Sequence, residues 1–369
     1  MRTPAAIDYS RLKQTQFSPE RVGNLRVAVA GAGALGNEVV QLLGLIGIGE
    51  IAVMDPGNVE ASNLTRSLFF REAGSIGANK AVALVRAAER LFPDTRFKAI
   101  PFEIADTGYG VLARNDVIFS CTDSSLARLQ TAYIARRLRI PMCDGGLGAE
   151  NYNHGRVSYF PASEGACYGC KLPPGKRREL LTFWESRIHP CRDTPGSDAA
   201  YPATPIMAAL IGALQVETGL RALLEGDHAA HTIELTLANP PKLDRFTTPV
   251  SSSCPFHESP FHESIPESFA ELPRRDSKLA DLLRGPSDSI VLDWPICVLA
   301  RCMDCGEEWS PMRRLAAIRK SGVCPQCGGH GILELESIRT IERQSPWAEM
   351  NAASLGLPQD HLYSIRAGA

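Results

Sequence analysis

Residues 25–36, LRVAVAGAGALG, decide the fold of this 369-residue chain. The apolar run that opens this stretch predicts a buried strand, and the apolar periodicity after it, through Leu45, predicts a helix. Between them, Gly31 suits a tight turn, Gly33 lets the backbone approach a phosphate, and Gly36 lets helix and strand pack closely. Strand, glycine turn and helix in this order are typical of a nucleotide-binding α/β domain.

The alternation of strands and helices continues beyond this unit. The expected elements are strands at 50–54, 96–100 and 117–120, helices at 79–91 and 206–224, and an alternating strand at 156–160. Such alternation predicts an α/β fold with a Rossmann-like, doubly wound and mostly parallel sheet. The glycine-punctuated segments after Pro141 predict an antiparallel extension of that sheet.

Composition divides the chain into segments of different character. The expected segments are an N-terminal arm at 1–24, a nucleotide-binding domain at 25–265 with a polar loop at 171–204, a linker at 266–289 with one helix at 277–283, a Cys-rich module at 290–345 and a tail at 346–369. The Cys-rich module is the second folded part that we expect.

Charge and cysteine content exclude several classes of protein. The chain has 39 Lys and Arg against 41 Asp and Glu, a balance that argues against a dedicated nucleic-acid binder. No signal peptide and no membrane-spanning apolar run are evident, so we expect a cytoplasmic protein without a membrane partner. In that compartment thiols stay reduced, and the 11 cysteines point to metal binding or catalysis.

Charged residues follow the predicted strands. Asp55 lies at the end of the second strand, 19 residues after Gly36, where a carboxylate can accept both ribose hydroxyls of NAD or ATP. Arg66, Lys80 and Asp123 each lie beyond the end of a strand, where open α/β sheets bind ligands. Singly, Lys80 is typical of a solvated helix start and Asp123 of a helix cap. Together they favour adenylyl transfer over hydride transfer, because only adenylyl transfer needs cations around phosphates.

The ordered motifs resemble a known superfamily over about residues 9–257. The chain is similar to the ubiquitin-like-protein activating enzymes and the ThiF/MoeB-type adenylyltransferases. The similarity lies in the order of the motifs: GxGxxG, Asp55, SNLxR at 62–66, Lys80 and CTD at 121–123. The resemblance implies that Asp55 holds the ribose of ATP, that Asn63, Arg66 and Lys80 hold the triphosphate, and that Asp123 holds Mg²⁺.

The N-terminal arm carries a further part of the resemblance. Tyr9-Ser10-Arg11 is similar to the family's Tyr-Ser-Arg-Gln segment, which implies that Arg11 reaches the ATP of a partner subunit in a homodimer. The chain departs from the family pattern at Leu12 and Ser67, where glutamines are usual, and at Gly57, where many members have a second aspartate.

The implied reaction joins a carrier protein to AMP. The C-terminal glycine carboxylate of a ubiquitin-like protein attacks the α-phosphate of ATP, and a conjugating enzyme then receives the carrier. The nearest alternative is a sulfur-carrier adenylyltransferase of the thiamin or molybdopterin type. A non-enzymatic scaffold and an NAD oxidoreductase are the remaining alternatives.

Paired cysteines predict two structural zinc sites. Cys302, Cys305, Cys324 and Cys327 have the spacing of a zinc ribbon. A further Cys-x-x-Cys pair is formed by Cys167 and Cys170, and we expect Cys254 and His257 to complete its zinc site. His262, in the repeat of the pentapeptide Pro-Phe-His-Glu-Ser, is the alternative fourth ligand.

Four cysteines remain after these assignments. Cys121, Cys143 and Cys297 lie in apolar surroundings and are expected in the core. Cys191 instead lies in a polar loop, where Arg192 favours the thiolate. The resemblance implies that Cys191 is the nucleophile that takes the carrier from the adenylate as a thioester.

Overall fold

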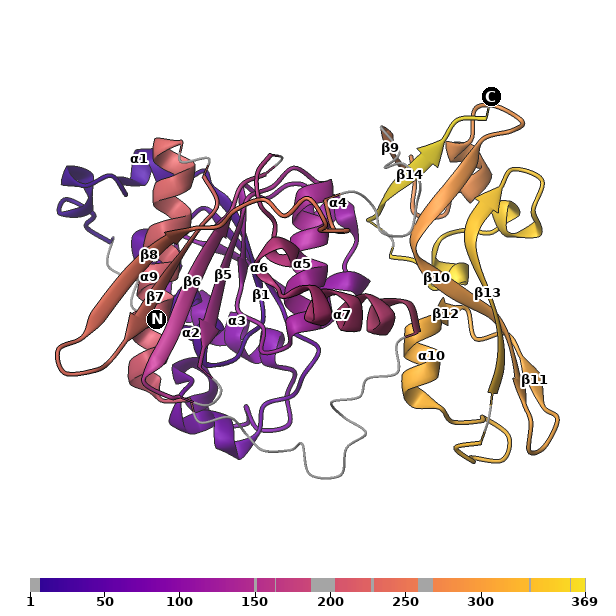
Figure 1. Ribbon diagram of the computed structural model, residues 1–369, viewed down its shortest axis with the longest axis horizontal. Coiled ribbons are helices and arrows are strands. Elements are labelled where there is room, and N and C mark those ends of the chain that lie inside the picture. Colours follow the sequence, from indigo (N-terminus) through magenta and orange to yellow (C-terminus); the bar gives the residue numbers. More distant parts are fainter. Residues whose placement is uncertain are drawn as a thin grey trace, which may run out of the picture. The chain divides into compact units, whose positions relative to one another are not determined.

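The computed structural model describes residues 7–148, 151–162, 164–186, 203–226, 229–257, 268–331, 333–358 and 360–368. The chain folds into two compact units (Figure 1). The first comprises Met1–Ala105, Leu112–Pro173 and Ala200–His257, and the second comprises Asp106–Val111, Pro174–Ala199 and Glu258–Ala369.

An eight-stranded sheet in the order β3-β2-β1-β4-β5-β6-β7-β8 forms the first unit. Its strands are β1 (Arg26–Ala30), β2 (Glu50–Met54), β3 (Arg96–Ile100), β4 (Val117–Ser120), β5 (Met142–Leu147), β6 (His154–Phe160), β7 (His231–Thr236) and β8 (Lys242–Thr247). Strands β1 to β5 are parallel, and β6, β7 and β8 are antiparallel. The predicted fold, a doubly wound sheet with an antiparallel extension, is confirmed, but the extension begins at β6, because β5, the first strand after Pro141, is parallel to β4.

The order of the strands reverses between β1 and β4, which is where open α/β sheets bind ligands. Ala30 pairs with Met54 on β2 and with Ser120 on β4. The carboxyl ends of these three strands therefore lie at the same level, and the segments after them share one edge of the sheet.

Helices cover both faces of this sheet. Alternate residues of a strand point to opposite faces: a side chain at Gly145 would meet Gln215, whereas one at Gly146 would meet Arg128. One face thus carries α2 (Ala34–Ile46) and α9 (Pro205–Glu225), and the other carries α5 (Ser125–Arg137).

Local signals fix where these helices begin and end. Asn79 caps α3 (Lys80–Leu91) by accepting a hydrogen bond from the Val82 amide, and Thr204 caps α9 in the same way. Helix α9 is long and apolar enough to cross a membrane by length and composition. It packs against α2, β5 and β6, as a core helix does.

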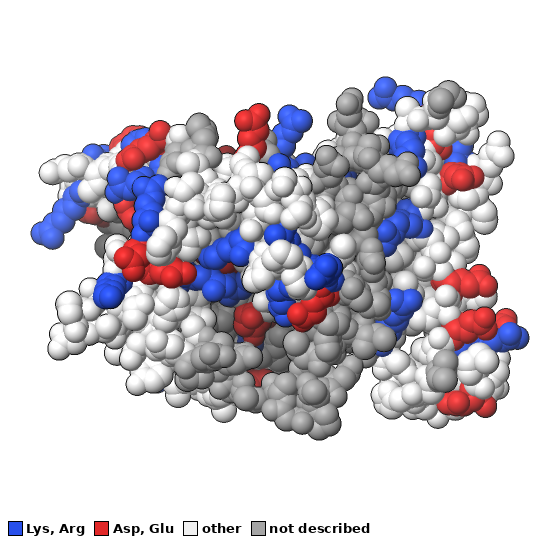
Figure 2. Space-filling model, in the orientation of Figure 1, with Lys and Arg blue, Asp and Glu red and all other residues white. Residues whose placement is uncertain are grey.

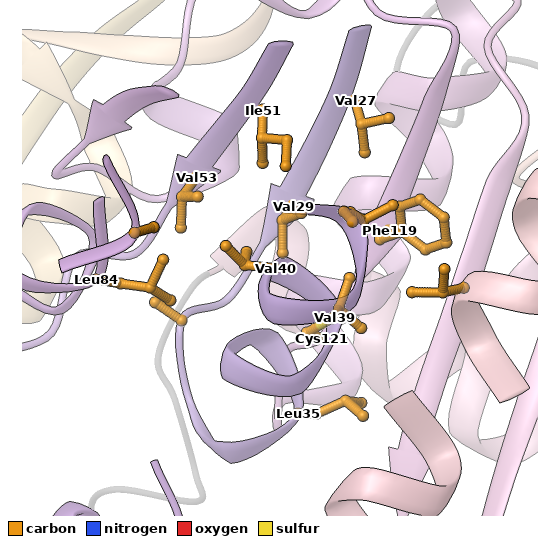
Figure 3. Close-up of a cluster of buried hydrophobic side chains, with 14 of the residues drawn as sticks. Val27, Val29, Leu35, Val39, Val40, Ile51, Val53, Leu84, Phe119 and Cys121 are labelled. Atoms are coloured by element: carbon orange, nitrogen blue, oxygen red, sulfur yellow. The ribbon is translucent and has the colours of Figure 1, made fainter. Parts of the chain in front are cut away.

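Valines of β1 and β2 fill the centre of the first unit. Figure 3 shows Val27, Val29 and Val53 beside Val39 and Leu84, which come from α2 and α3. All five side chains are fully buried. Each contributes about 1.5–3 kcal/mol relative to an exposed position.

The polar stretch at 171–204, which was expected as a loop, begins with helices. Helix α6 spans Tyr168–Lys171 and helix α7 spans Pro174–Ser186. A proline at the first helical position and the buried Leu180 favour α7, although charged residues dominate its sequence. Residues 187–202 lie outside the described part of the chain.

The second unit is built on an antiparallel six-stranded sheet around the long strand β10. Its elements are β9 (Ser268–Glu271), η5 (Leu279–Leu282), β10 (Ser289–Cys302), β11 (Glu308–Trp309), β12 (Arg313–Arg314), α10 (Leu315–Ser321), β13 (Leu333–Glu342), η6 (Pro346–Glu349), η7 (Ala353–Leu355) and β14 (Leu362–Arg366). Short helices elsewhere in the chain are η1 (Leu12–Gln14), α1 (Pro19–Val22), η2 (Ala61–Thr65), η3 (Leu68–Arg71), η4 (Ile104–Asp106) and α4 (Tyr109–Leu112).

The structure corrects the expected linker and tail. Residues 266–289 contain β9 and the 3₁₀ turn η5 in place of the expected helix at 277–283, and their Leu279 and Leu282 are buried in the core of the second unit. In the expected tail at 346–369, β14 pairs with β10 and β9, and Tyr363 is buried. Burial of these apolar residues makes both segments part of the module.

Figure 2 shows basic and acidic side chains interspersed over the visible face. This matches the near-equal numbers of basic and acidic residues, 39 and 41.

Candidate nucleotide site and metal centres

The glycine turn after β1 is fixed by close backbone contacts. Gly31 has a φ of 101°, and a side chain there would approach the Cys121 carbonyl oxygen to 2.7 Å. A side chain at Gly36 would overlap the carbonyl oxygen of Gly31. Only glycine at these two positions lets β1, α2 and the end of β4 come together.

Gly33 differs, because a side chain there would point into open space with nothing within 4 Å. It precedes the first turn of α2, whose start has no side-chain cap. Backbone N–H groups at such a helix start attract anions. The turn therefore fits a phosphate group, which would lie where a Cβ of residue 33 would project.

Alanine substitutions separate packing from binding in this turn. Gly36→Ala is expected to lower the free energy of unfolding by about 1–3 kcal/mol, because the new methyl group meets fixed backbone. Gly33→Ala is expected to leave stability nearly unchanged and to weaken ATP binding at least about tenfold. Urea unfolding and ATP titration measure the two effects, and tight ATP binding by Gly33→Ala would contradict the phosphate cradle.

Asp55 and Lys80 lie together beside this turn. The Asp55 carboxylate accepts hydrogen bonds from the amides of Ala32 and Gly57, both at 2.8 Å. A Cβ added to Gly57 would lie 3.1 Å from Asp55 Oδ1 and 3.5 Å from Lys80 Nζ. The carboxylate retains lone pairs for a ribose hydroxyl, since each oxygen can accept more than one hydrogen bond.

The next two predicted residues lie on the short helix η2 and directly after it. Asn63 Oδ1 accepts a hydrogen bond from the Glu60 amide at 3.0 Å. Arg66 Nη1 donates to the Ser62 carbonyl at 3.1 Å. These local bonds fix both side chains on the segment that follows β2.

Asp123 follows β4 and is exposed. The interpretation of Asp123 as a helix cap is wrong, because the cap of α5 is Ser124, whose hydroxyl accepts from the Ala127 amide. Its carboxylate is thus available at the same sheet edge as the glycine turn. Arg11, at the start of η1, is also exposed.

Asn37 supports the glycine turn and is a site residue that the sequence motifs do not indicate. Its side-chain amide donates to the carbonyls of Ala32 and Gly33 at 2.9 and 3.0 Å, and its oxygen accepts from the Phe69 amide at 3.1 Å. Asn37 is 1% exposed. An amide inside an otherwise apolar helix face was the available signal, because buried polar groups need partners.

A buried ion pair positions the segment that carries Asp123, and it was also missed. Arg128 Nη1 lies 2.8 Å from Asp144 Oδ2, and Arg128 Nη2 donates to the Thr122 carbonyl at 2.6 Å. Ser120 donates to Asp144 Oδ1 at 2.9 Å. Ser120 and Thr122, at the end of β4, are therefore hydrogen-bonded to side chains of β5 and α5.

Comparison with known proteins agrees with this geometry. Residues 12–255 match the model of the ThiF family. The chain belongs to the ThiF family. The superfamily resemblance predicted from the motifs is confirmed.

Relatives of this ThiF-family chain include activating enzymes. The SAMP-activating enzyme E1 of Haloferax volcanii is 29% identical over 214 residues, 55% of this chain and 75% of that protein. The adenylyltransferase and sulfurtransferase UBA4 of Eremothecium gossypii is 27% identical, over 55% of this chain and 42% of that protein. Ubiquitin-like modifier-activating enzyme 5 of Arabidopsis thaliana is 27% identical, over 45% of this chain and 43% of that protein. The chain thus spans less than half the length of the last two.

Solved structures share the fold. E. coli MccB with succinimide is 20% identical, with a TM-score of 0.50 over 67% of this chain and 73% of MccB. MccB with ATP is 19% identical, with the same TM-score and coverage.

The ThiF-family domain holds the first predicted metal centre. The ligand atoms of Cys167, Cys170, Cys254 and His257 all lie within 4.8 Å of one another. His257 Nε2 is 2.8 Å from Cys170 Sγ, and the sulfurs of Cys167 and Cys254 are 3.6 Å apart. Three thiolates and one imidazole fit tetrahedral Zn²⁺. The alternative ligand His262 lies outside the described residues.

The second unit holds the other predicted centre. The sulfurs of Cys302, Cys305, Cys324 and Cys327 lie within 4.8 Å of one another, on the end of β10 and the turn after α10. This set is compatible with a closed, structural zinc site, because four protein ligands leave no position for water.

We expect two zinc ions per chain. Replacing Cys324 by alanine is expected to lower the content by one ion and to destabilise the second unit, because a site with three ligands binds zinc weakly. Elemental analysis with urea unfolding measures both effects. Cys297→Ala is the matched control and should keep both zinc ions. A wild-type content below two zinc ions per chain would contradict one of the two predicted sites.

The other described thiols are poor nucleophiles. Cys121, Cys143 and Cys297 are buried, and burial raises the pKa of each thiol. Their expected place in the core is confirmed. Cys191 lies outside the described residues.

Proposed function

We propose that this protein activates a ubiquitin-like protein in two steps, adenylation of its C-terminal glycine and transfer to Cys191 as a thioester. In the first step a carboxylate oxygen of the carrier bonds to the α-phosphorus of ATP, and the bond to pyrophosphate breaks. In the second step the Cys191 thiolate bonds to the carrier's carbonyl carbon, and AMP leaves.

The arrangement of the glycine turn, Asp55 and Lys80 carries the proposal. The open position beside Gly33 suits a phosphate, Asp55 suits the ribose, and the Lys80 ammonium lies beside Asp55. The first step brings two anions together, so cations must stabilise the charge that develops on the phosphate oxygens. Arg66 and Lys80 would supply that charge from this chain.

Asp123 would hold Mg²⁺, which offsets charge on the leaving pyrophosphate when bound. An exposed carboxylate at the end of β4 suits this ion, since Mg²⁺ is usually bound by one or two carboxylates and substrate phosphates. Arg11, on the N-terminal arm, would complete the site of a partner subunit in a homodimer. A conjugating enzyme would then take the carrier from Cys191.

Elimination supports Cys191 as the nucleophile. Seven of the eleven cysteines belong to the two metal clusters, and three are buried in apolar surroundings. Only Cys191 is left, and its neighbours His189 and Arg192 favour a thiolate.

Sulfur-carrier activation is the second candidate. The relative from Eremothecium gossypii is named both adenylyltransferase and sulfurtransferase, and this chain covers 42% of it. Both candidates share the adenylation step, and they differ in the fate of the adenylated carrier.

One experiment separates the candidates. The protein is incubated with ATP, Mg²⁺ and a small glycine-terminated protein encoded beside its gene, and the products are run on a non-reducing gel. A reducible adduct supports conjugation. Pyrophosphate exchange without an adduct supports sulfur transfer, and the absence of both contradicts the proposed function.

A further inference from the structure

Arg156 is a charged side chain that the proposed chemistry does not use. It lies on β6, opposite Gly146 on β5 and Glu234 on β7. Its Nε is buried without a hydrogen-bond partner in the described chain. Glu234 is its cross-strand neighbour, yet no ion pair joins the two among the residues that the structure places.

Other cations surround Arg156. Lys171, from α6, donates a hydrogen bond to Ser158 Oγ at 2.6 Å, and Ser158 lies two residues after Arg156, on the same face of β6. A Cβ at Gly146 would lie 2.9 Å from Arg128 Nη1 and 3.5 Å from Arg156 Cγ. The aliphatic part of the Arg156 side chain therefore lies close to the Arg128 guanidinium, on the same face of the sheet.

Two carboxylates, Asp144 and Glu234, lie near these three cations and balance their charge only in part. Asp144 is fully buried, and both its oxygens are already bonded to Arg128 and Ser120. A buried guanidinium nitrogen that makes no hydrogen bond costs free energy, since its desolvation is not compensated. An incoming carboxylate would recover that cost through charge-assisted hydrogen bonds.

The register places this group next to the nucleotide site. Ser120 pairs with Asp144, which pairs with Ser158, so Arg156 on β6 lies level with Thr122 after β4. Neighbouring strands are about 4.8 Å apart, which puts Arg156 roughly 10 Å from the end of β4. An extended peptide covers that distance in about three residues.

We propose that Arg156, with Lys171, receives an acidic side chain about three residues before the C-terminus of the incoming polypeptide. This inference rests on the proposed function, because it takes the terminal carboxylate to react beside Asp123. Arg156 is then a specificity-determining residue that selects carriers with an acidic tail and disfavours basic ones.

Fluorescent peptides test the inference without the need for turnover. The probes are alanine peptides that end in Gly-Gly with a free carboxylate and carry one Glu two, three, four or five residues before the end, with Gln and Lys peptides as controls. Binding to the full chain is measured by fluorescence anisotropy. We expect the Glu peptide with the best spacing to bind about tenfold more tightly than its Gln counterpart.

Substitutions of Arg156 test whether this residue causes the preference for the Glu peptide. Arg156→Gln is expected to remove the preference for Glu, and Arg156→Glu to shift it to the Lys peptide. The matched control Lys242→Gln, an exposed cation on β8, should keep the wild-type preference. Equal binding of Glu and Gln peptides by the wild type, or no binding of any peptide at millimolar concentration, would overturn the inference.

The melting temperature and ATP–pyrophosphate exchange provide two further tests that do not depend on peptide binding. Because Arg156 Nε makes no hydrogen bond within the described chain, Arg156→Gln is expected to keep or raise the melting temperature; a clear loss would indicate a structural role and overturn the inference. ATP–pyrophosphate exchange tests the proposed function separately. If the wild type is active in exchange but binds the Glu and Gln peptides equally, only this inference is refuted. If it binds the Glu peptide selectively but shows no exchange, only the proposed function is refuted.

Discussion

Replacing Asp123 by alanine is expected to lower ATP–pyrophosphate exchange at least about 10³-fold, to the background of the assay. The reason is electrostatic, because Asp123 is the proposed Mg²⁺ ligand at the sheet edge where two anions must meet. The fold should survive, since Asp123 is exposed and Ser124 supplies the cap of α5. Exchange is measured with labelled pyrophosphate, and thermal unfolding checks stability.

The matched control is Asp244→Ala, which removes an exposed carboxylate from β8 in the same unit. It should keep wild-type exchange. Full exchange by Asp123→Ala would refute the assignment of this residue to the metal.

Replacing Cys191 by alanine is expected to abolish the reducible adduct while exchange stays within about threefold of wild type. The two steps use different groups, so loss of the thiol leaves adenylation intact. Cys191→Ser sharpens the test, because an oxyester adduct resists reductant and is cleaved by hydroxide. Non-reducing electrophoresis, with and without each reagent, measures these outcomes.

Thr194→Ala, a nearby change in the same stretch, should form the normal adduct. A thiol-sensitive adduct on Cys191→Ala would place the nucleophile elsewhere. Loss of exchange in that variant would mean that the residue serves the adenylation site instead.

Strands β1 to β4 and β6 and the helices α2, α3 and α9 were predictable because their signals are local. A strand, a glycine turn and an apolar helical period lie within a few residues of one another around Gly31. The common edge at which Asp55 and Lys80 lie follows from the rule that ligands bind beyond the carboxyl ends of the strands in doubly wound sheets.

The second unit was predicted less well, because its pairings are distant in sequence. Strand β9 pairs with β14, at the opposite end of the module. Short strands of this kind carry little periodic signal, and only their partners show that Tyr363 is buried. The segments that hold them consequently resembled a linker and a tail.

The metal ligands could be predicted from the sequence and the polar network could not, because only the ligands have a local sequence signal. Cys-x-x-Cys pairs bind one ion from adjacent positions, so spacing alone indicates them. The sequence favoured His257 as the fourth ligand, with His262 of the repeated Pro-Phe-His-Glu-Ser segment as the alternative, and the position of His257 beside Cys170 agrees with this expectation. Asn37 and the Arg128–Asp144 pair depend on long-range contacts that no local pattern encodes.

Mass analysis of the carrier tests the central claim most directly. The protein is mixed with ATP, Mg²⁺ and a glycine-terminated candidate carrier, the reaction is stopped with acid, and the C-terminal peptide of the carrier is weighed. We predict that Cys191→Ala, which cannot take the carrier from the adenylate, adds one adenylyl group to the terminal glycine and that Asp123→Ala adds none. An unmodified carrier in the Cys191→Ala reaction, with ATP either intact or cleaved to ADP, would contradict the account.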